Sequence, residues 1–345
     1  MNKYRVLRSR YDHTSFLIEK KMFIILPTLL LVSFILFILG LSVGSTVIHP
    51  WSVMEHILGT GDGDHAFIIE TLRLPRMLLA FLVGVSLAVS GLILQGLVRN
   101  PLASPDIIGI TGGAKVAAVL LITYFSSVSI RWLPVVAIAG AGIAAFIIYM
   151  LAWKKGISPI RLVLIGIGIE AGMGALVTMM IVLAPIYSTS EAYIWLTGSV
   201  YGANWHDVFL MLPWVLVFVP VSMLLARRIN IQELGDDLAM GAGSNVQLDR
   251  CILIFISVAL AGSAVAFAGG ISFVGLISPH IARKLVGRSF GSLAPVAALI
   301  GGCIVMLADI AARTVFLPLD LPAGVFVSGI GAPFFIFLLY RNRNM

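Results

Sequence analysis

Long apolar stretches alternate with short polar segments along almost the whole chain. The apolar stretches cover, in order, residues 22–44, 76–98, 107–126, 133–153, 161–184, 207–226, 251–268, 275–286, 293–312 and 324–340. About 20 apolar residues in helical conformation cross the roughly 30 Å hydrocarbon core of a bilayer, and a helix satisfies its own backbone hydrogen bonds there. The pattern therefore predicts an all-α integral membrane protein with about ten transmembrane helices, of which that at 275–286 is short.

The composition supports the same class. Of the 345 residues, 59% are hydrophobic and 11% are charged, whereas soluble globular chains carry roughly one quarter charged residues. Cys251 and Cys303 lie in apolar stretches, where they are interpreted as small hydrophobic residues, so we expect neither a disulfide framework nor a metal site. The net charge of +7 is typical of basic loops on the cytoplasmic side of a membrane, and we expect no nucleic-acid partner.

An even number of crossings places both termini on the same side of the membrane. The predicted loops and tails on that side hold 18 of the 23 lysines and arginines: Lys3, Arg5, Arg8, Arg10, Lys20, Lys21, Arg99, Lys154, Lys155, Arg161, Arg227, Arg228, Arg250, Arg283, Lys284, Arg288, Arg341 and Arg343. By the positive-inside rule this side is the cytoplasm. Residues 1–21 are then a basic cytoplasmic tail, and residues 22–345 a single transmembrane domain. A cleaved signal peptide is disfavoured, because the apolar stretch at 22–44 is too long and no small-x-small site follows it.

Five basic residues fall outside this distribution: Arg73, Arg76, Lys115, Arg131 and Arg313. Arg73 and Arg76 open the second predicted helix, and Arg313 lies near the outer end of the ninth. One interpretation is that these three side chains snorkel to the membrane interface. The other is that their guanidinium groups face outward to bind carboxylates of a partner, which arginine holds in bidentate geometry. Asp309, four residues before Arg313, is placed to neutralise it.

Seven blocks of sequence together resemble the permease subunits of ATP-driven importers for iron–siderophores and vitamin B12, the FecCD/BtuC-like type II importers. The blocks are RLPR at 73–76, SGLILQGLVRNPLASPDIIG at 90–109, TGSVYGANW at 197–205, INIQELGDDLAMGAG at 229–243, GGISFVGLISPHIAR at 269–283, LADIAAR at 307–313 and LPAGVFVSGIGAPFFIFLL at 321–339. Each block alone is moderately specific. Their common order along a chain of this class makes the resemblance specific.

The resemblance implies a transporter built from several chains in a bacterial cytoplasmic membrane. An extracytoplasmic siderophore-binding protein would deliver the ferric siderophore, and two permease chains, identical or related, would form the path. A cytoplasmic ATPase dimer, which binds ATP and Mg, would drive alternating access. In such permeases the arginines that match Arg73, Arg76 and Arg313 face acidic residues of the binding protein, so the resemblance implies a docking role for them. Cobalamin or haem is the alternative cargo.

Residues 229–249 form the second segment for which the resemblance implies a partner. Their sequence predicts two short helices, interrupted at Gly235 and again around residues 241–243. An ordinary solvated loop is the alternative interpretation. The resemblance implies that this segment couples the permease to the ATPase through Leu234, Gly235, Asp236, Asp237, Ala239, Met240 and Gly243. Ala242 is smaller than the aliphatic residue usual in the family, which would either weaken a packing contact or shift it onto Met240.

Several residues are candidates for the translocation path or the central helix around it: Gln95, Asn100, Pro101, Gly275, Pro279 and His280. Gln95 lies within the second predicted helix and faces either the path or a neighbouring helix. The glycines at 269, 270 and 275 predict a broken, non-helical approach to a short helix, which a membrane tolerates only inside protein or beside a wet cavity. We place His280 near the start of this helix, where a capping or packing role is favoured over ligand binding or a proton relay. No second metal ligand lies at metal spacing near it.

Lys115 and Glu170 stand where the family usually has small or apolar residues. Charged groups inside a bilayer are rare and often functional. At 1.5 Å per residue both lie roughly 12–14 Å from the inner surface, so we predict an ion pair between the third and fifth helices. We expect four glycines of the fifth helix to allow close approach: Gly166, Gly168, Gly172 and Gly174. The alternative is that either charge lines the path and touches a polar ligand.

The chain carries none of the common catalytic motifs. It has no nucleophile elbow, no HExxH and no GxxxxGK[ST] phosphate loop. We therefore expect a translocation subunit that is not itself an enzyme, binds no cofactor directly and relies on a partner for ATP hydrolysis. A proton-coupled secondary carrier is the competing class, because Lys115, Glu170 and Asp309 offer a proton relay and such carriers also use broken helices.

Overall fold

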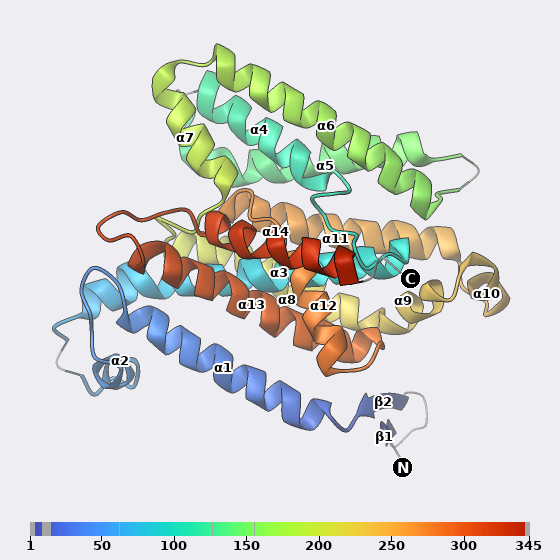
Figure 1. Ribbon diagram of the computed structural model, residues 1–345, viewed down its shortest axis with the longest axis horizontal. Coiled ribbons are helices and arrows are strands. Elements are labelled where there is room, and N and C mark those ends of the chain that lie inside the picture. Colours follow the sequence, from blue (N-terminus) through green and yellow to red (C-terminus); the bar gives the residue numbers. More distant parts are fainter. Residues whose placement is uncertain (1–3, 9–14, 62, 126, 155, 342–345) are drawn as a thin grey trace.

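The computed structural model describes residues 4–8, 15–61, 63–125, 127–154 and 156–341. Figure 1 shows an elongated bundle of helices with a small two-stranded sheet near one end. The helices are α1 (Met22–Ser42), α2 (Pro50–Ile57), the π-helix η1 (Phe67–Arg73), α3 (Leu74–Val98), α4 (Ile110–Tyr124), the 3₁₀ turn η2 (Ile130–Trp132), α5 (Leu133–Ala152), α6 (Pro159–Leu183), α7 (Ile186–Thr197), α8 (Trp205–Leu224), α9 (Ala226–Glu233), α10 (Asp236–Gly241), α11 (Val246–Ala268), α12 (Val274–Leu285), α13 (Phe290–Thr314) and α14 (Ala323–Arg341).

Each predicted apolar stretch corresponds to a helix, which confirms the multi-spanning helical class. Eight helical segments of the described chain are long and apolar enough to cross a membrane. Helix α4 has 15 residues and α12 has 12, so α12 extends only about 18 Å at 1.5 Å per residue. The number of crossings therefore stays a prediction. The described ends of the chain, β1 and the end of α14, lie at the same end of the bundle as α9 and α10 (Figure 1).

The basic tail contains the strands, which the all-helical prediction did not include. Strand β1 (Tyr4–Arg8) pairs antiparallel with β2 (Ser15–Glu19). The Glu19 carboxylate accepts a hydrogen bond of 2.8 Å from the backbone N–H of Gly287, between α12 and α13. This bond fixes the end of β2 to the turn that precedes α13.

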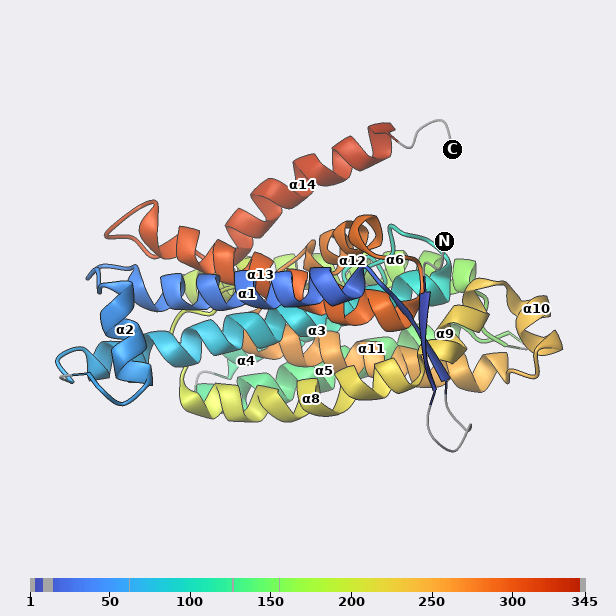
Figure 2. The same cartoon turned by 90° about the horizontal axis from the view of Figure 1, so that it is seen from below.

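Helix α3 is the centre of the bundle, and α8, α11, α12 and α13 pack around it. The most apolar part of Phe67–Val98 is 89% buried, compared with 17% for α6 at the periphery. We call the end where α3 begins the outer end and the end where it finishes the inner end, in keeping with the charge distribution. Helices α4 to α7 lie along one side of this core (Figure 1), and α14 leans away from the bundle (Figure 2).

Two glycines of α3 allow its backbone to touch neighbouring backbones. A Cβ atom on Gly84 would overlap the backbone of Gly301 in α13, and one on Gly91 would overlap the backbone of Gly275 in α12. Helices in a bilayer associate through such packing, because lipid supplies no hydrophobic driving force between them. The small residues of α3 are therefore required by its contacts.

The predicted break before the short helix is confirmed. Residues 269–273 are not helical, and Phe273, directly before α12, has a positive φ of 67°. This stretch lies inside the protein, where non-helical backbone is tolerated. The predicted position of His280 is wrong: α12 begins at Val274, so Pro279 and His280 lie in its middle.

The backbone contact at Gly91 predicts a specific loss of stability. We expect Gly91→Ala to lower the melting temperature of the purified protein, because overpacking of a filled interior costs about 1–3 kcal/mol. Gly142→Ala in α5 is the matched control, since a Cβ atom there meets nothing within 4 Å. Thermal unfolding in detergent measures both variants. An equal effect of the two substitutions would show that the contact with Gly275 is unimportant.

Candidate functional site

A cavity of about 700 Å³ lies at the outer end and is lined by all three predicted docking arginines, Arg73, Arg76 and Arg313. Tyr201, from the turn before α8, and Asp320, from the loop between α13 and α14, also line it. Segments far apart in the sequence therefore form one charged surface. The cavity is the strongest candidate for contact with a partner at this end of the bundle.

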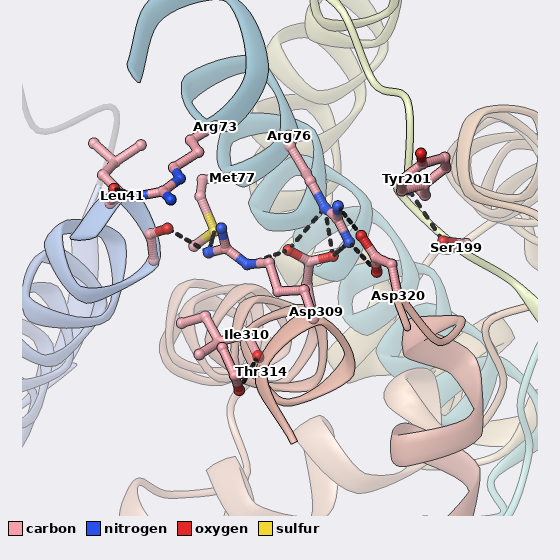
Figure 3. A network of polar contacts seen from close by, with 12 residues as sticks. Leu41, Arg73, Arg76, Met77, Ser199, Tyr201, Asp309, Ile310, Thr314 and Asp320 are labelled. Atoms are coloured by element: carbon pink, nitrogen blue, oxygen red, sulfur yellow. Dashed lines mark hydrogen bonds and ion pairs between the residues drawn. The ribbon is translucent and has the colours of Figure 1, made fainter. Parts of the chain in front are cut away.

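Arg76 lies between two carboxylates (Figure 3). Its Nε donates to Asp309 Oδ1 at 2.9 Å, while Nη1 and Nη2 donate to the two Asp320 oxygens at 2.7 and 2.9 Å. The guanidinium group also stacks 5.5 Å from the centre of the Tyr201 ring. The two acids differ in burial, because the Asp309 side chain is 0% exposed and that of Asp320 is 25% exposed.

Arg73 and Arg313 connect the network to α1. Arg73 donates to the carbonyl oxygens of Leu41 and Ser42 at 2.7 and 3.1 Å, and Arg313 donates to that of Gly40. The predicted pair of Arg313 with Asp309 is present at 3.6 Å from Nε to Oδ2. The arginines thus bind α1, α3 and α13 together at the outer end.

The expectation that these three arginines face outward with free guanidinium groups is wrong. Each is less than a tenth exposed and already has partners within the chain. A buried charge is costly unless it is paired, and the carboxylates of Asp309 and Asp320 supply that pairing for Arg76. Their role in docking stays a prediction. Asp320 was missed because it lies 244 residues from Arg76 and no local pattern connects the two.

A second cavity, of about 330 Å³, lies at the inner end. Its lining consists of Gln95, Arg99, Asn100, Pro101, Glu233, Arg283 and Arg288. Burial raises the pKa of the Glu233 carboxyl above its ordinary value, and the nearby Arg283 and Arg288 oppose that shift. Three of the predicted path residues, Gln95, Asn100 and Pro101, are therefore brought together here.

Gln95 lines the inner cavity and also forms hydrogen bonds with the neighbouring helix α12. Its Nε2 donates to the carbonyl oxygen of Gly275 at 3.1 Å, and its Oε1 accepts from Arg283 Nη1 at 2.5 Å. Asn100 Oδ1 accepts from the backbone N–H of Leu102 at 2.9 Å and so stabilises the turn after α3. The two hydrogen bonds of Gln95 fix α12 to the inner half of α3.

The other predicted path residues pack between helices. Gly275 abuts Gly91 of α3, and Pro279 is buried within α12. The ring of His280 meets that of Phe334 in α14 edge to face, with centroids 5.8 Å apart. None of the three lines the outer or the inner cavity described above.

The predicted coupling segment contains two short helices, α9 and α10, as expected, separated at Gly235 with φ +110°. Leu234 and Met240 are 63% and 57% exposed, and Asp237 is also exposed. Ala239 is fully buried, so it packs inside the segment instead of presenting a surface. Gly243 has a positive φ of 80° in the turn after α10.

Leu238 was not predicted, yet it is 64% exposed beside Leu234 and Met240 along the segment. Exposed apolar side chains that form a contiguous patch are a common mark of a protein interaction surface. The alternation of exposed Leu238 and Met240 with buried Ala239 could have been recognised only once the short helix was placed against α9 and α11.

The predicted ion pair between Lys115 and Glu170 is confirmed, with 3.1 Å between Nζ and Oε1. It connects α4 and α6. Of the four glycines expected to permit this approach, Gly166 does so, because a Cβ atom there would overlap the backbone of Ile108. The expectation was wrong for Gly168, Gly172 and Gly174, which have nothing within 4 Å and lie on the open side of α6.

Asp106, in the turn before α4, was missed as a neighbour of this pair. Burial raises the pKa of its carboxyl above the ordinary value, and the nearby Lys115 ammonium group opposes that shift. The second oxygen of Glu170, Oε2, has no hydrogen-bond partner among the described residues. The cluster therefore holds two carboxylates and one ammonium group.

Comparison with known proteins identifies the family. Residues 30–341 match the FecCD transport family. The chain belongs to this family. It is 48% identical over 332 residues to the "Probable siderophore transport system permease protein YfhA" of Bacillus subtilis (strain 168), covering 94% of this chain and 97% of that protein. It is 50% identical over 306 residues to the achromobactin transport system permease protein CbrC of Dickeya dadantii (strain 3937), covering 88% of each.

A solved structure of a metal-chelate type ABC transporter in an inward-facing conformation has the same fold. Its TM-score with this chain is 0.81 at 31% sequence identity, and the match covers 92% of this chain and 99% of the other. The FecCD chain described here is therefore a multi-pass permease subunit of the ABC transporter class. This result confirms the resemblance that the seven sequence blocks indicated.

The contact between Lys115 and Glu170 predicts non-additive mutational effects. We expect Lys115→Ala and Glu170→Ala each to reduce thermal stability and uptake, because each leaves a partly buried charge without its partner. The double variant should recover part of the loss, with a coupling energy of about 1 kcal/mol in a double-mutant cycle. Glu191→Ala, which removes an exposed acid in α7, is the control. Strictly additive losses would show that the pair is energetically unimportant.

Proposed function

We propose that this FecCD chain and a second permease chain, identical or related, form the path for a ferric siderophore across the bacterial cytoplasmic membrane. A cytoplasmic ATPase dimer, carrying ATP and Mg, drives alternating access, and the permease chain itself performs no catalysis and binds no cofactor. The observation that carries the proposal is the match along nearly the whole chain to permeases whose names specify siderophore and achromobactin transport.

The proposed orientation places the inner end in the cytoplasm. Arg99, Arg283 and Arg288 lie around the inner cavity, and α9 and α10 lie at the same end. Basic residues are retained on the cytoplasmic side during membrane insertion. In this orientation the outer cavity opens toward the extracytoplasmic binding protein.

The ATPase dimer is proposed to bind the coupling segment. Leu234, Leu238 and Met240 offer apolar contacts there, and Asp237 offers an exposed carboxylate. Apolar residues surrounded by polar ones are the usual composition of a specific protein interface. The exposed Met240 also fits the expectation that packing shifts toward it because Ala242 is small.

The binding protein is proposed to dock over the outer cavity, where its carboxylates meet the network around Arg76. Because Arg76 is already paired, an incoming carboxylate competes with a carboxylate of this chain. Asp309 is 0% exposed, whereas Asp320 is 25% exposed on a loop, so Asp320 is the acid that exchanges. In docking, a carboxylate of the binding protein therefore replaces Asp320 as a partner of Arg76. The loop that carries Asp320 leads directly into α14.

The proposed function is tested by uptake into proteoliposomes that contain the permease, its ATPase and its binding protein. Ferric citrate and a ferric hydroxamate, each labelled with radioactive iron, serve as probes. We expect uptake of at least one probe to require ATP and to persist when a protonophore collapses the proton gradient. Uptake that needs the gradient and ignores ATP would establish the secondary carrier instead, and preferred uptake of cobalamin or haem would replace the proposed cargo.

The exchange of ion pairs makes a separate prediction about docking. We expect Asp320→Asn to raise the affinity for the binding protein by about threefold to tenfold. The partly exposed pair of Asp320 with Arg76 competes with docking, and such a pair contributes on the order of 1 kcal/mol. Arg76→Ala should weaken binding. Asp64→Asn, which removes an exposed acid at the same end, should leave it unchanged. Surface plasmon resonance on the reconstituted complex measures all three, and weaker binding by Asp320→Asn would refute the exchange.

A further inference from the structure

Asp236, the first residue of α10, joins two arginines from different parts of the chain. Its Oδ1 accepts from Arg99 Nη2 at 3.0 Å and from Arg250 Nη2 at 2.8 Å. Arg99 directly follows α3, and Arg250 lies in α11 with its side chain only 1% exposed. One carboxylate oxygen thus connects the coupling segment to the inner ends of two long helices.

Arg250 extends this connection to a third segment. Its Nη1 donates to the carbonyl oxygen of Ile157, in the turn between α5 and α6. The N–H of Ile157 donates to Oε1 of Gln247, which lies one turn before Arg250 in α11, at 2.9 Å. Both backbone groups of Ile157 are therefore held by side chains of α11.

The backbone on either side of Asp236 is shaped for this contact. Gly235 has φ +110° and ψ 158°, a conformation that is essentially restricted to glycine. A Cβ atom at this position would lie 3.2 Å from Arg99 Nη1. Arg99 itself has a left-handed conformation with φ 58°, which ends α3 abruptly. The two unusual conformations bring the start of α10 against the end of α3.

We infer that Asp236 and Arg250 form a node that makes α10, the inner end of α3 and the α5–α6 turn move as one unit. Removal of the carboxylate would leave the buried Arg250 guanidinium without its charged partner, which is strongly unfavourable. Displacement of α10 relative to α3 and the turn would therefore break both contacts of Asp236. Asp236 and Arg250 act as positioning residues.

The contacts of Asp249, in the same region, connect different segments. Asp249 accepts from Arg228 Nη1 at 2.7 Å and from Ser244 Oγ at 2.6 Å. Asp249 lies in the first turn of α11, so these contacts fix α9 and the turn after α10 to the start of α11. Of the ion pairs described at the inner end, those of Asp236 connect the coupling segment to α3. Helix α3 contains Gln95, which lines the inner cavity.

The mechanical part of the inference is tested on the permease alone, in lipid nanodiscs, by hydrogen exchange with mass spectrometry. We expect Asp236→Asn to accelerate exchange at least fivefold in peptides that cover residues 99–104 and 156–158, as well as in α10. Asp237→Asn is the matched control, because this exposed carboxylate one residue further has no described ion pair. Acceleration confined to α10 would overturn the node.

The role of the node in transport rests on the proposed function and is tested in the complete complex with ATPase and binding protein. Ferric citrate and a ferric hydroxamate are the probes. We expect Asp236→Asn to lower the iron transported per ATP hydrolysed about tenfold. Arg227→Gln, which neutralises an exposed charge in α9 outside the node, should match the unmodified protein.

The exchange experiment and the transport experiment together distinguish a failure of the node from a failure of the proposed function. A proportional fall of hydrolysis and transport in Asp236→Asn would indicate a damaged complex and would overturn the positioning role. An unmodified complex that shows no ATP-dependent uptake of either probe would contradict the proposed function, while the exchange experiment would still decide whether the node exists. A normal ratio of transport to hydrolysis in Asp236→Asn would show that the connection does not carry the coupling.

Discussion

The close backbone contact of α3 with its neighbours is the constraint on which the rest of the structure depends. Gly84 touches α13 and Gly91 touches α12, so no side chain can enter either crossing. Two polar side chains of α3 have partners within reach: Ser90 Oγ lies 2.7 Å from Ser257 Oγ of α11, and Gln95 binds α12. Because packing provides the association of helices in lipid, these contacts define a single arrangement of the core.

At each end of α3, an arginine joins the helix to another segment of the chain. At the outer end Arg76 joins α3 to the loop before α14, and at the inner end Arg99 joins the finish of α3 to α10. Both use a carboxylate from a distant part of the sequence, and in both cases the carboxylate belongs to a short connecting segment or helix. Segments that are proposed to meet soluble partners are thereby attached to the most buried helix of the protein.

The sequence predicted the apolar helices, the break before α12, the two short helices around Gly235 and the pair of Lys115 with Glu170, because each depends on local composition or on depth along a helix. It did not predict α2 or α7. It could not predict that Arg73 and Arg313 bind backbone carbonyl groups of α1. Every residue has a backbone carbonyl group, so the residue types do not indicate which one is bound. The glycines of α6 show a related limit. Gly166 contacts a neighbour and Gly172 does not, although both are glycine in the same helix, because only the packing direction distinguishes them.

The unequal burial of the two acids that share Arg76 has a consequence for the divergence of related permeases. The Asp309 side chain is fully buried against Arg76, so a neutral residue at either position removes a charged partner of the other. Asp320 stands on an exposed loop and can be replaced on its own. Among relatives, positions 76 and 309 should therefore tend to vary together, whereas position 320 should vary independently of both.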